Sequence, residues 1–213
     1  MSFKIFAAAL ATAAFVQPAS AQTAAPVNGP RVEARVGLDR VRIKSTFDDG
    51  VDAISDSAHE DGVVFGGEFG YDRTVGNGLV FGAYAGVDFS TTEYCSEVYG
   101  GDEGCLDAGR NITLGLRAGA NLSPTILAYA KGGFSNGRVT ASYDDGVDSY
   151  KVAENRDGFH LGVGLEANFK SNTYVKAEYV YTDYEDFGAD FDGLSFGIEP
   201  SRHQLLTGVG IRF

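Results

Sequence analysis

The sequence predicts an all-β protein, an eight-stranded antiparallel transmembrane up-and-down β-barrel. Three observations support this prediction. Apolar and polar residues alternate with a period of two in segment after segment, which is typical of strands with two different faces. The connections between these segments alternate between short and long. Glycine is frequent, with 29 among 213 residues, and the chain ends on an aromatic residue, Phe213.

The N-terminal segment has the pattern of a secretory signal peptide. Lys4 is followed by an apolar run over residues 5–16 and by three small residues at 19–21. This order of charge, apolar run and small residues is the pattern of a cleaved export signal. The run is shorter than the roughly 20 residues of a membrane-spanning helix. We therefore expect a signal peptide over residues 1–21, a short linker over 22–30 and one barrel domain over 31–213.

Eight segments alternate in the manner of strands. In residues 79–89 the odd positions are apolar, and the even positions are mostly glycine with one aspartate. The pattern is least regular in the first segment, where the alternation slips at Arg40. Each segment is near the 9–11 residues that a tilted strand needs to cross a membrane. The predicted strands cover residues 31–43, 62–72, 79–90, 111–121, 126–135, 158–169, 173–182 and 201–213.

The connections sort by length. Residues 73–78, 122–125 and 170–172 are predicted to be short turns, whereas 46–61, 91–109, 136–157 and 182–200 are predicted to be long loops. Short turns at one end and long loops at the other are typical of a bacterial outer-membrane barrel.

An internal repeat supports an even strand number. Residues 42–52 resemble residues 138–148 at an offset of 96, and the same offset carries Asp61 and Gly62 onto Asp157 and Gly158. This shift equals four predicted strands, so the repeat indicates two four-stranded halves.

The polar faces decide which side of each strand points inward. A soluble lipocalin-like carrier would enclose its apolar face, and a membrane barrel would turn that face to lipid. An Arg or Lys facing lipid near the midplane costs roughly 2–4 kcal/mol, so we expect the charged faces inside, where strand glycines leave them room. The predicted interior charge network comprises Glu33, Arg35, Glu68, Arg117, Lys131, Glu166, Lys176, Glu178, Arg202 and Arg212.

The aromatic residues of the apolar face lie near the strand ends, where interfacial girdles are found. These residues are Phe69, Tyr71, Phe89, Phe134, Phe159, Phe169, Tyr179, Tyr181 and Phe213. Inside, eight strands leave a space that side chains just fill. Because unpaired buried charge is costly, we expect a plugged or very narrow lumen. A narrow pore for ions or small solutes, with charge pairs that exchange partners, is the alternative.

The C-terminus carries a family resemblance. One face of the last predicted strand holds Leu205, Thr207, Val209, Ile211 and Phe213. This face resembles the terminal signature that the barrel-assembly machinery reads during insertion. Residues 202–213 resemble the last strand of the small OmpA-like and opacity-type outer-membrane barrel family, and residues 31–37 and 174–179 resemble its first and seventh strands. The resemblance implies the outer membrane of a Gram-negative bacterium, a structural and surface role such as adhesion, and no shared catalytic residues.

The four long loops are acidic. They hold 22 of the 29 acidic residues, with only Arg138, Lys151 and Arg156 as bases. This balance argues against nucleic-acid binding, which needs basic surfaces. The expected partners are outer-membrane lipid, lipopolysaccharide and a host or surface ligand of the loops, without a cofactor.

Two repeated aspartate motifs are weak candidates for Ca²⁺. They lack the spacing of a helix–loop–helix calcium site, and Asp-Gly is first of all a turn former. Their residues are Asp48, Asp49, Asp52, Asp144, Asp145 and Asp148.

Cys95 and Cys105 are the two cysteines of the chain. In an exported protein they predict one disulfide within the second long loop. A metal site is the poorer alternative, because two thiolates without a nearby histidine make an incomplete ligand set.

One trio of residues is worth testing for catalysis. Ser201 and His203 share the outward face of the last strand, and Glu199 is close in sequence. A hydrolase or transferase acting on lipid acyl chains could use such a set, but a histidine at the membrane interface is normally a girdle residue. We therefore expect no enzyme activity. His160 is expected inside the barrel as a member of the network, and His59 in a loop.

Overall fold

The computed structural model describes residues 27–48, 53–76, 78–97, 103–144, 149–169, 172–191 and 194–213. The expected signal peptide lies outside these residues, and the first strand begins two residues before the predicted domain start. None of the described residues belongs to a helix that is long and apolar enough to cross a membrane. The strands are β1 (Gly29–Asp48), β2 (Ala53–Val75), β3 (Leu79–Ser90), β4 (Glu93–Glu97), β5 (Glu103–Asn121), β6 (Ile126–Asp144), β7 (Ser149–Asn168), β8 (Thr173–Tyr184), β9 (Phe187–Phe191) and β10 (Leu194–Arg212).

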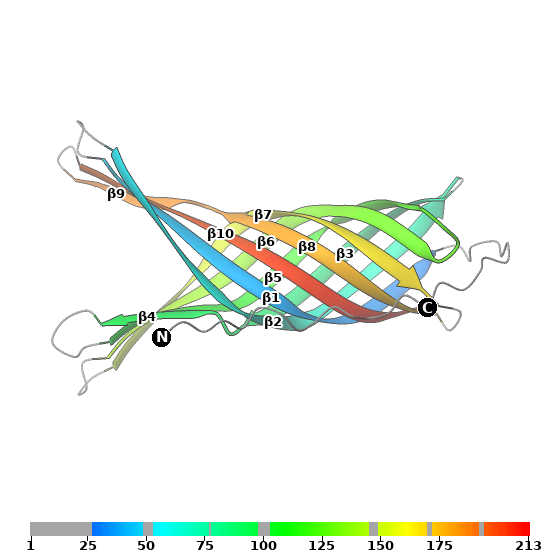
Figure 1. Ribbon diagram of the computed structural model, residues 1–213, viewed down its shortest axis with the longest axis horizontal. Coiled ribbons are helices and arrows are strands. Elements are labelled where there is room, and N and C mark those ends of the chain that lie inside the picture. The colour runs from blue at the N-terminus through cyan, green and yellow to red at the C-terminus, as the bar shows by residue number, and fades with distance from the viewer. Residues whose placement is uncertain are drawn as a thin grey trace, which may run out of the picture.

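Eight of these strands form a closed antiparallel ring. Its order is β1, β2, β3, β5, β6, β7, β8 and β10, and β1 closes the ring by pairing with β10 from Arg31 opposite Arg212 to Asp48 opposite Ser195. In Figure 1 the blue β1 accordingly runs beside β10. Antiparallel closure leaves no free edge in the ring. The prediction of an eight-stranded up-and-down barrel is confirmed.

The predicted lengths of the four long loops are wrong, because the strands continue far beyond the ends that the sequence predicts. The ladder of β1 with β2 runs on to Asp48 opposite Ala53, and that of β6 with β7 runs on to Asp144 opposite Ser149. Two further strands, β4 and β9, pair with β5 and β10 in the other two connections. His59 thus lies in β2 and not in a loop. Backbone pairing continues where the lipid-facing apolar pattern stops, so the pattern underestimates strand length.

The internal repeat corresponds to two equivalent hairpins. In each hairpin, the described residue pair nearest the turn is Asp48 with Ala53 or Asp144 with Ser149. The numbers of these two pairs differ by 96, the offset of the sequence repeat. The hairpin of β1 and β2 lies four ring positions from that of β6 and β7, so the two project from opposite sides of the barrel. Figure 1 shows the strands separating into two arms at the end of the barrel that carries these hairpins, while the C-terminus lies at the end with the short turns. One arm consists of the outer parts of β1, β2, β9 and β10, and the other of those of β4, β5, β6 and β7.

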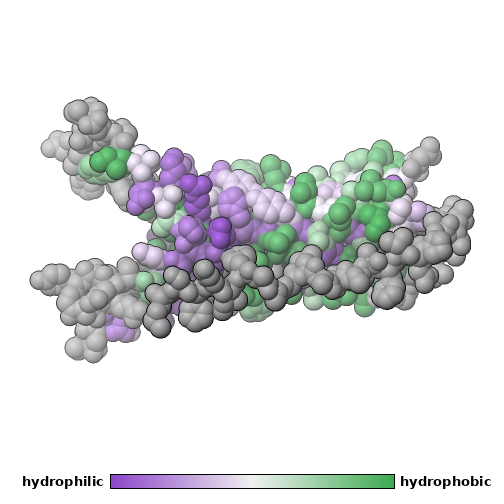
Figure 2. All heavy atoms as spheres, viewed as in Figure 1, coloured by the Kyte–Doolittle hydropathy of each residue, from purple (hydrophilic) through white to green (hydrophobic). Residues whose placement is uncertain are grey.

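The apolar faces point outward over the barrel body. Leu116 and Val163 are 69% and 58% exposed, whereas Arg117 and Glu166 are 3% and 0% exposed. Figure 2 shows the hydrophobic side chains gathered over the half of the barrel with the short turns and hydrophilic ones toward the arms. The exposed apolar band is the surface that a membrane barrel presents to lipid. This arrangement is opposite to that of a soluble lipocalin-like carrier.

The irregularity at Arg40 is an inversion of polarity and not a slip of the strand. β1 pairs without interruption with both neighbours, so its odd-numbered residues all point to the inside of the barrel. These include Arg35 and Asp39 and, further along the strand, Val41 and Ile43. Charged residues such as Arg40 now occupy the outer face. Beyond the apolar band the outer face meets water, and the inner face becomes the apolar one.

Candidate functional site

The barrel interior is filled by paired charges. Among the described residues, seven acidic and seven basic side chains of the ring strands are buried, so their formal charges balance. The ten residues of the predicted network all lie in this interior. Sequence reasoning missed four further members, Arg31, Asp39, Asp72 and Asp88. Every second residue of a strand points to the same face. Each of the four lies an even number of residues from a predicted network member or an inward glycine of its own strand, and this spacing is the signal that identifies it.

Asp72 holds the guanidinium groups at the end of the barrel that carries the short turns. Its carboxylate lies 2.5 Å from Arg117, 3.1 Å from Arg212 and 3.2 Å from Arg31. Arg31 and Arg212 face each other across the β1–β10 closure, so this one acid offsets a pair of like charges at the seam. Glu166 accepts hydrogen bonds from two of the three arginines that contact Asp72, from Arg117 at 3.1 Å and from Arg212 at 2.8 Å.

Glu68 is the centre of the network. It accepts bonds from Arg31 at 2.6 Å, from Arg35 at 2.6 Å and from Lys131 at 2.8 Å. Lys131 also reaches Glu178 at 3.1 Å. Charge-assisted hydrogen bonds of this length are strong in a medium of low dielectric constant.

Three buried tyrosines complete the packing of this layer. Tyr129 donates to Glu178 at 2.7 Å, and Tyr174 donates to Glu33 at 3.0 Å. Each tyrosine ring lies where a glycine of a neighbouring strand has no side chain. The pairs are Tyr84 against Gly115, Tyr129 against Gly164 and Tyr174 against Gly210.

Two small apolar clusters lie inside the barrel, one toward each end of the network around Glu68. Val64, Val180 and Leu206 form one buried cluster, between the charged centre and the arms. The other is at the end with the short turns and consists of Val27, Val80, Leu127 and Tyr129. These inward apolar residues interrupt the polar interior.

Near the base of the arms, a polar group closes the interior. Arg202 forms a two-point ion pair with Asp39, with both distances 2.6 Å, and the Ser90 and Thr92 hydroxyls donate to the same aspartate. His160 lies inside the barrel as expected, where its ring nitrogens contact the hydroxyls of Tyr84 and Ser135.

The arms enclose an open mouth beyond Arg202. A cavity of about 600 Å³ lies between them, and its inner wall is largely apolar. Figure 2 shows the hollow between the two arms. The apolar part of the wall consists of Val41, Ile43, Ala58, Tyr94, Leu106, Ala108, Val139, Ala141, Val152, Tyr184, Ile198 and Pro200.

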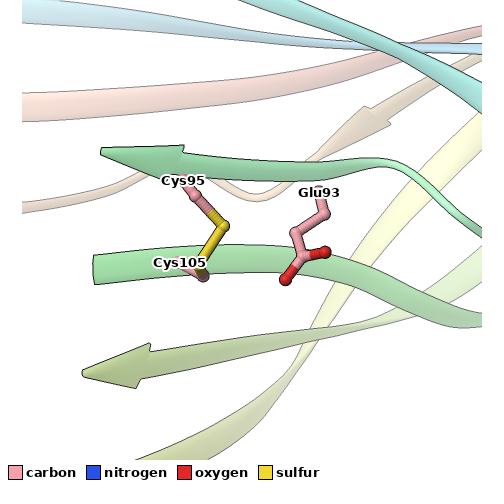
Figure 3. Close-up of side chains that lie close together, drawn as sticks. All are labelled: Glu93, Cys95 and Cys105. Atoms are coloured by element: carbon pink, nitrogen blue, oxygen red, sulfur yellow. A yellow bond between two sulfur atoms is a disulfide. The ribbon is translucent and has the colours of Figure 1, made fainter. Parts of the chain in front are cut away.

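The disulfide predicted from the cysteine pair is confirmed. Cys95 of β4 and Cys105 of β5 lie opposite each other and are joined at 2.03 Å. Figure 3 shows the bridge with Glu93 beside it. The three side chains lie close enough together for a metal ion, but sulfur atoms in a disulfide are not thiolates and do not make the ligand set of a thiolate metal site.

The candidate catalytic trio is not joined into one hydrogen-bonded unit. His203 Nδ1 contacts the Tyr179 hydroxyl at 2.7 Å, and its ring lies 5.0 Å from that of Tyr181. Glu199 is paired with Lys44 at 3.0 Å. A histidine between two interfacial tyrosines is the arrangement of a girdle residue.

An exposed ion pair lies close by on the outer face. Arg40 holds Asp61 at 2.5 Å, and this hydrogen bond lowers the pKa of the aspartate below its ordinary value.

The aspartates of the repeated motif do not come together in the part of the chain that is described. Asp48 and Asp144 lie at the ends of the two opposite hairpins. Asp49, Asp52, Asp145 and Asp148 lie outside the described residues.

The outward positions of the last strand are exposed as expected. Leu205, Thr207, Val209, Ile211 and Phe213 all face away from the interior. Of the expected girdle residues, Tyr181 is half-buried and the others are exposed.

Comparison with known proteins agrees with this geometry. Residues 6–213 match the family model described as "Outer membrane protein beta-barrel domain". The chain is 31% identical over 151 residues to the 22 kDa outer membrane protein of Rhizobium leguminosarum bv. viciae, covering 70% of this chain and 66% of that protein. It is 26% identical over 226 residues to the 31 kDa outer-membrane immunogenic protein of Brucella melitensis biotype 1, covering 96% of this chain and 93% of that one.

Among solved structures, the outer membrane protease OmpT from Escherichia coli matches with a TM-score of 0.52 and 11% identity, covering 91% of this chain and 100% of that one. At that identity the likeness shows the barrel fold alone. The matched family and relatives, together with the closed ring and its exposed apolar band, place the chain in the bacterial outer membrane. It belongs to the outer membrane protein beta-barrel domain family.

Proposed function

We propose that this protein is a non-conducting outer-membrane barrel that holds two rigid arms at the cell surface for contact with other molecules. The observation that carries the proposal is the balanced, buried charge network, which two buried apolar clusters interrupt. An ion crossing such an interior would have to break several charge-assisted bonds and pass buried apolar side chains that offer it no hydrogen-bond partners.

The surface role is supported by the construction of the arms. The β4–β5 disulfide and the long ladders of β1 with β2 and of β6 with β7 hold the arms in shape. A pre-organised surface loses less entropy on binding than a flexible loop does. The Brucella relative is named an immunogenic protein, which is consistent with arms that other molecules can reach.

Conductance measurements test the sealed interior. Purified protein in planar lipid bilayers is expected to give no steady single-channel steps. The matched control is Tyr84→Ala combined with Tyr174→Ala, which removes two interior rings that pack against glycines and is expected to admit ions. Large and steady steps from the unaltered protein would overturn the proposal in favour of a narrow pore.

Accessibility on intact cells tests the surface role. A short epitope inserted between Asp144 and Ser149 is expected to bind antibody added outside the cell. The same epitope within residues 122–125, a turn at the other end of the barrel, is expected to bind antibody only after the outer membrane is permeabilised. The reverse result would show that the arms do not face the exterior.

A further inference from the structure

The mouth between the arms exposes apolar side chains to water. Val152 is 63% exposed, Leu106 39% and Val139 38%, and all three line the cavity. Lipid does not cover them, because neighbouring outward positions at this height, such as Arg42 and Lys44 of β1, are charged. Contiguous apolar surface that neither lipid nor the protein core covers typically marks a binding site.

The size of the cavity limits its occupant. A volume of about 600 Å³ lies within the range of about 300–1,000 Å³ typical of sites for one small organic molecule. Walls from both arms surround this space, since Val41 and Ile43 come from β1 and Val139 and Ala141 from β6. A single compact apolar group therefore fits better than an extended flat surface.

The charges around the cavity favour a cation. Asp56 and Glu60 of β2 line it, and among the described residues neither forms an ion pair. Of the other charged residues in the lining, Arg138 is matched in formal charge by Asp107, and Arg156 is paired with Glu154 at 2.5 Å. His59 also lines the cavity. At the cavity floor, Arg202 is neutralised by Asp39.

The four connections that the sequence predicts as long loops hold 22 acidic residues and three basic ones, and the outer face of β1 adds Arg40, Arg42 and Lys44. A cleft whose charges leave an excess of one sign concentrates ions of the opposite sign.

We propose that the mouth is a binding site for a small amphipathic cation, with its apolar body between Val41, Val139 and Val152 and its positive group near Asp56 and Glu60. The site goes beyond the surface role proposed above and does not depend on whether the lumen conducts. It uses the inner face of the arms, where the polarity of the strands is inverted relative to the barrel body.

The test compares three probes that share one apolar body. These are 4-phenylbutylamine, 4-phenylbutan-1-ol and 5-phenylpentanoate, which carry a positive, a zero and a negative charge at neutral pH on the same phenylbutyl body. The protein is held in lipid nanodiscs, because detergent would compete for an apolar cavity. Methyl NMR then reports the location. Ile43, Leu106 and Val152 mark the mouth, whereas Leu116 and Val163 of the lipid-facing surface mark simple partition into the bilayer.

The expected result is a saturable shift of the mouth methyl groups with the amine, at an affinity about tenfold above that of the carboxylate, which is the size expected of one partly screened charge interaction. Combining Asp56→Asn with Glu60→Gln is expected to reduce that preference to about twofold or less. Equal binding of all three probes, stronger binding of the carboxylate, or shifts confined to Leu116 and Val163 would overturn the assignment.

Two variants of the wall complete the test. Ala141→Trp fills the cavity and is expected to weaken the amine about tenfold or more, whereas Thr140→Trp, on the outer face one residue away, is expected to change it less than about twofold. If Ala141→Trp fails to fold, Val152→Thr keeps the shape and adds a hydroxyl to the wall, and it is expected to weaken binding about threefold. Unchanged affinity in both Ala141→Trp and Val152→Thr would contradict binding in the mouth.

Discussion

The central carboxylate of the interior provides a direct test of the charge network. Glu68→Gln keeps the size and shape of the side chain and removes its charge. It leaves Arg31, Arg35 and Lys131 without a common counter-ion, although each keeps another acidic partner. The interior would then carry one excess positive charge.

The magnitude follows from burial. The Glu68 side chain is 1% exposed and its three ion pairs measure 2.6–2.8 Å. Removing one partner of a buried pair costs about 3–5 kcal/mol. We expect the lower end, about 3 kcal/mol, because the amide oxygen still accepts a hydrogen bond and the three cations keep other acids.

The assay is the urea dependence of unfolding in lipid vesicles. Unfolding is followed by far-UV circular dichroism and by heat-dependent gel mobility, because the chain has no Trp whose fluorescence could report it. Adding Lys131→Met restores the charge balance and is expected to recover about half of the loss or more. Asp61→Asn is the matched control, because it removes an acid from the exposed pair with Arg40, and no measurable change is expected there. If Glu68→Gln costs no more than this control, the charges are solvated and the sealed interior is wrong.

Two further experiments test the packing of the barrel interior and the disulfide of the arm. Gly164→Ala would place a Cβ atom 2.5 Å from the Tyr129 ring and is expected to cost about 1–3 kcal/mol by overpacking, whereas Gly197→Ala, which has open space, is expected to be neutral in the same urea titration. Equal midpoints for these two variants would contradict the assigned packing. Replacing Cys95 and Cys105 by serine removes a constraint of roughly 3 kcal/mol on the unfolded loop. It is expected to speed cleavage of residues 93–107 by added protease on intact cells while leaving the heat-dependent gel shift unchanged, and an unchanged cleavage rate would show that the bridge does not protect the arm.

The barrel body could be predicted from sequence because two environments impose the period-two pattern there. Lipid on one side and a narrow interior on the other leave few residue types acceptable at each position. Ten of the fourteen buried charged positions, the glycines beside them and the C-terminal strand were predicted from this pattern, and the missed Asp72 and Asp88 fit the same pattern. Asp88 stood out as the one acid among inward glycines of its strand, and Asp72 follows from the parity that identified Glu68.

The arms could not be predicted in the same way, because the environments change at the membrane surface. Beyond Asp39 the outer face of β1 meets water and the inner face lines the mouth, so the polarity of the two faces is exchanged. Read as a continuous pattern, this exchange looks like the end of the strand at Arg40. The backbone ladder, which holds the strand together, leaves no mark in the side-chain pattern.

The orientation of β1 is tested most directly by an accessibility scan with spin labels. Single cysteines from Arg35 to Ser45, in a protein with both native cysteines replaced, are probed by electron paramagnetic resonance with oxygen and with a water-soluble nickel complex. Labels at positions 36 and 38 face lipid and are expected to collide with oxygen. Labels at positions 40 to 45 are expected to be accessible to the nickel complex on both faces of the strand. A label at position 35 is expected to be accessible to neither reagent. Nickel access at position 35 would contradict the sealed interior, and oxygen without nickel at positions 40, 42 and 44 would contradict the inverted polarity of the arms.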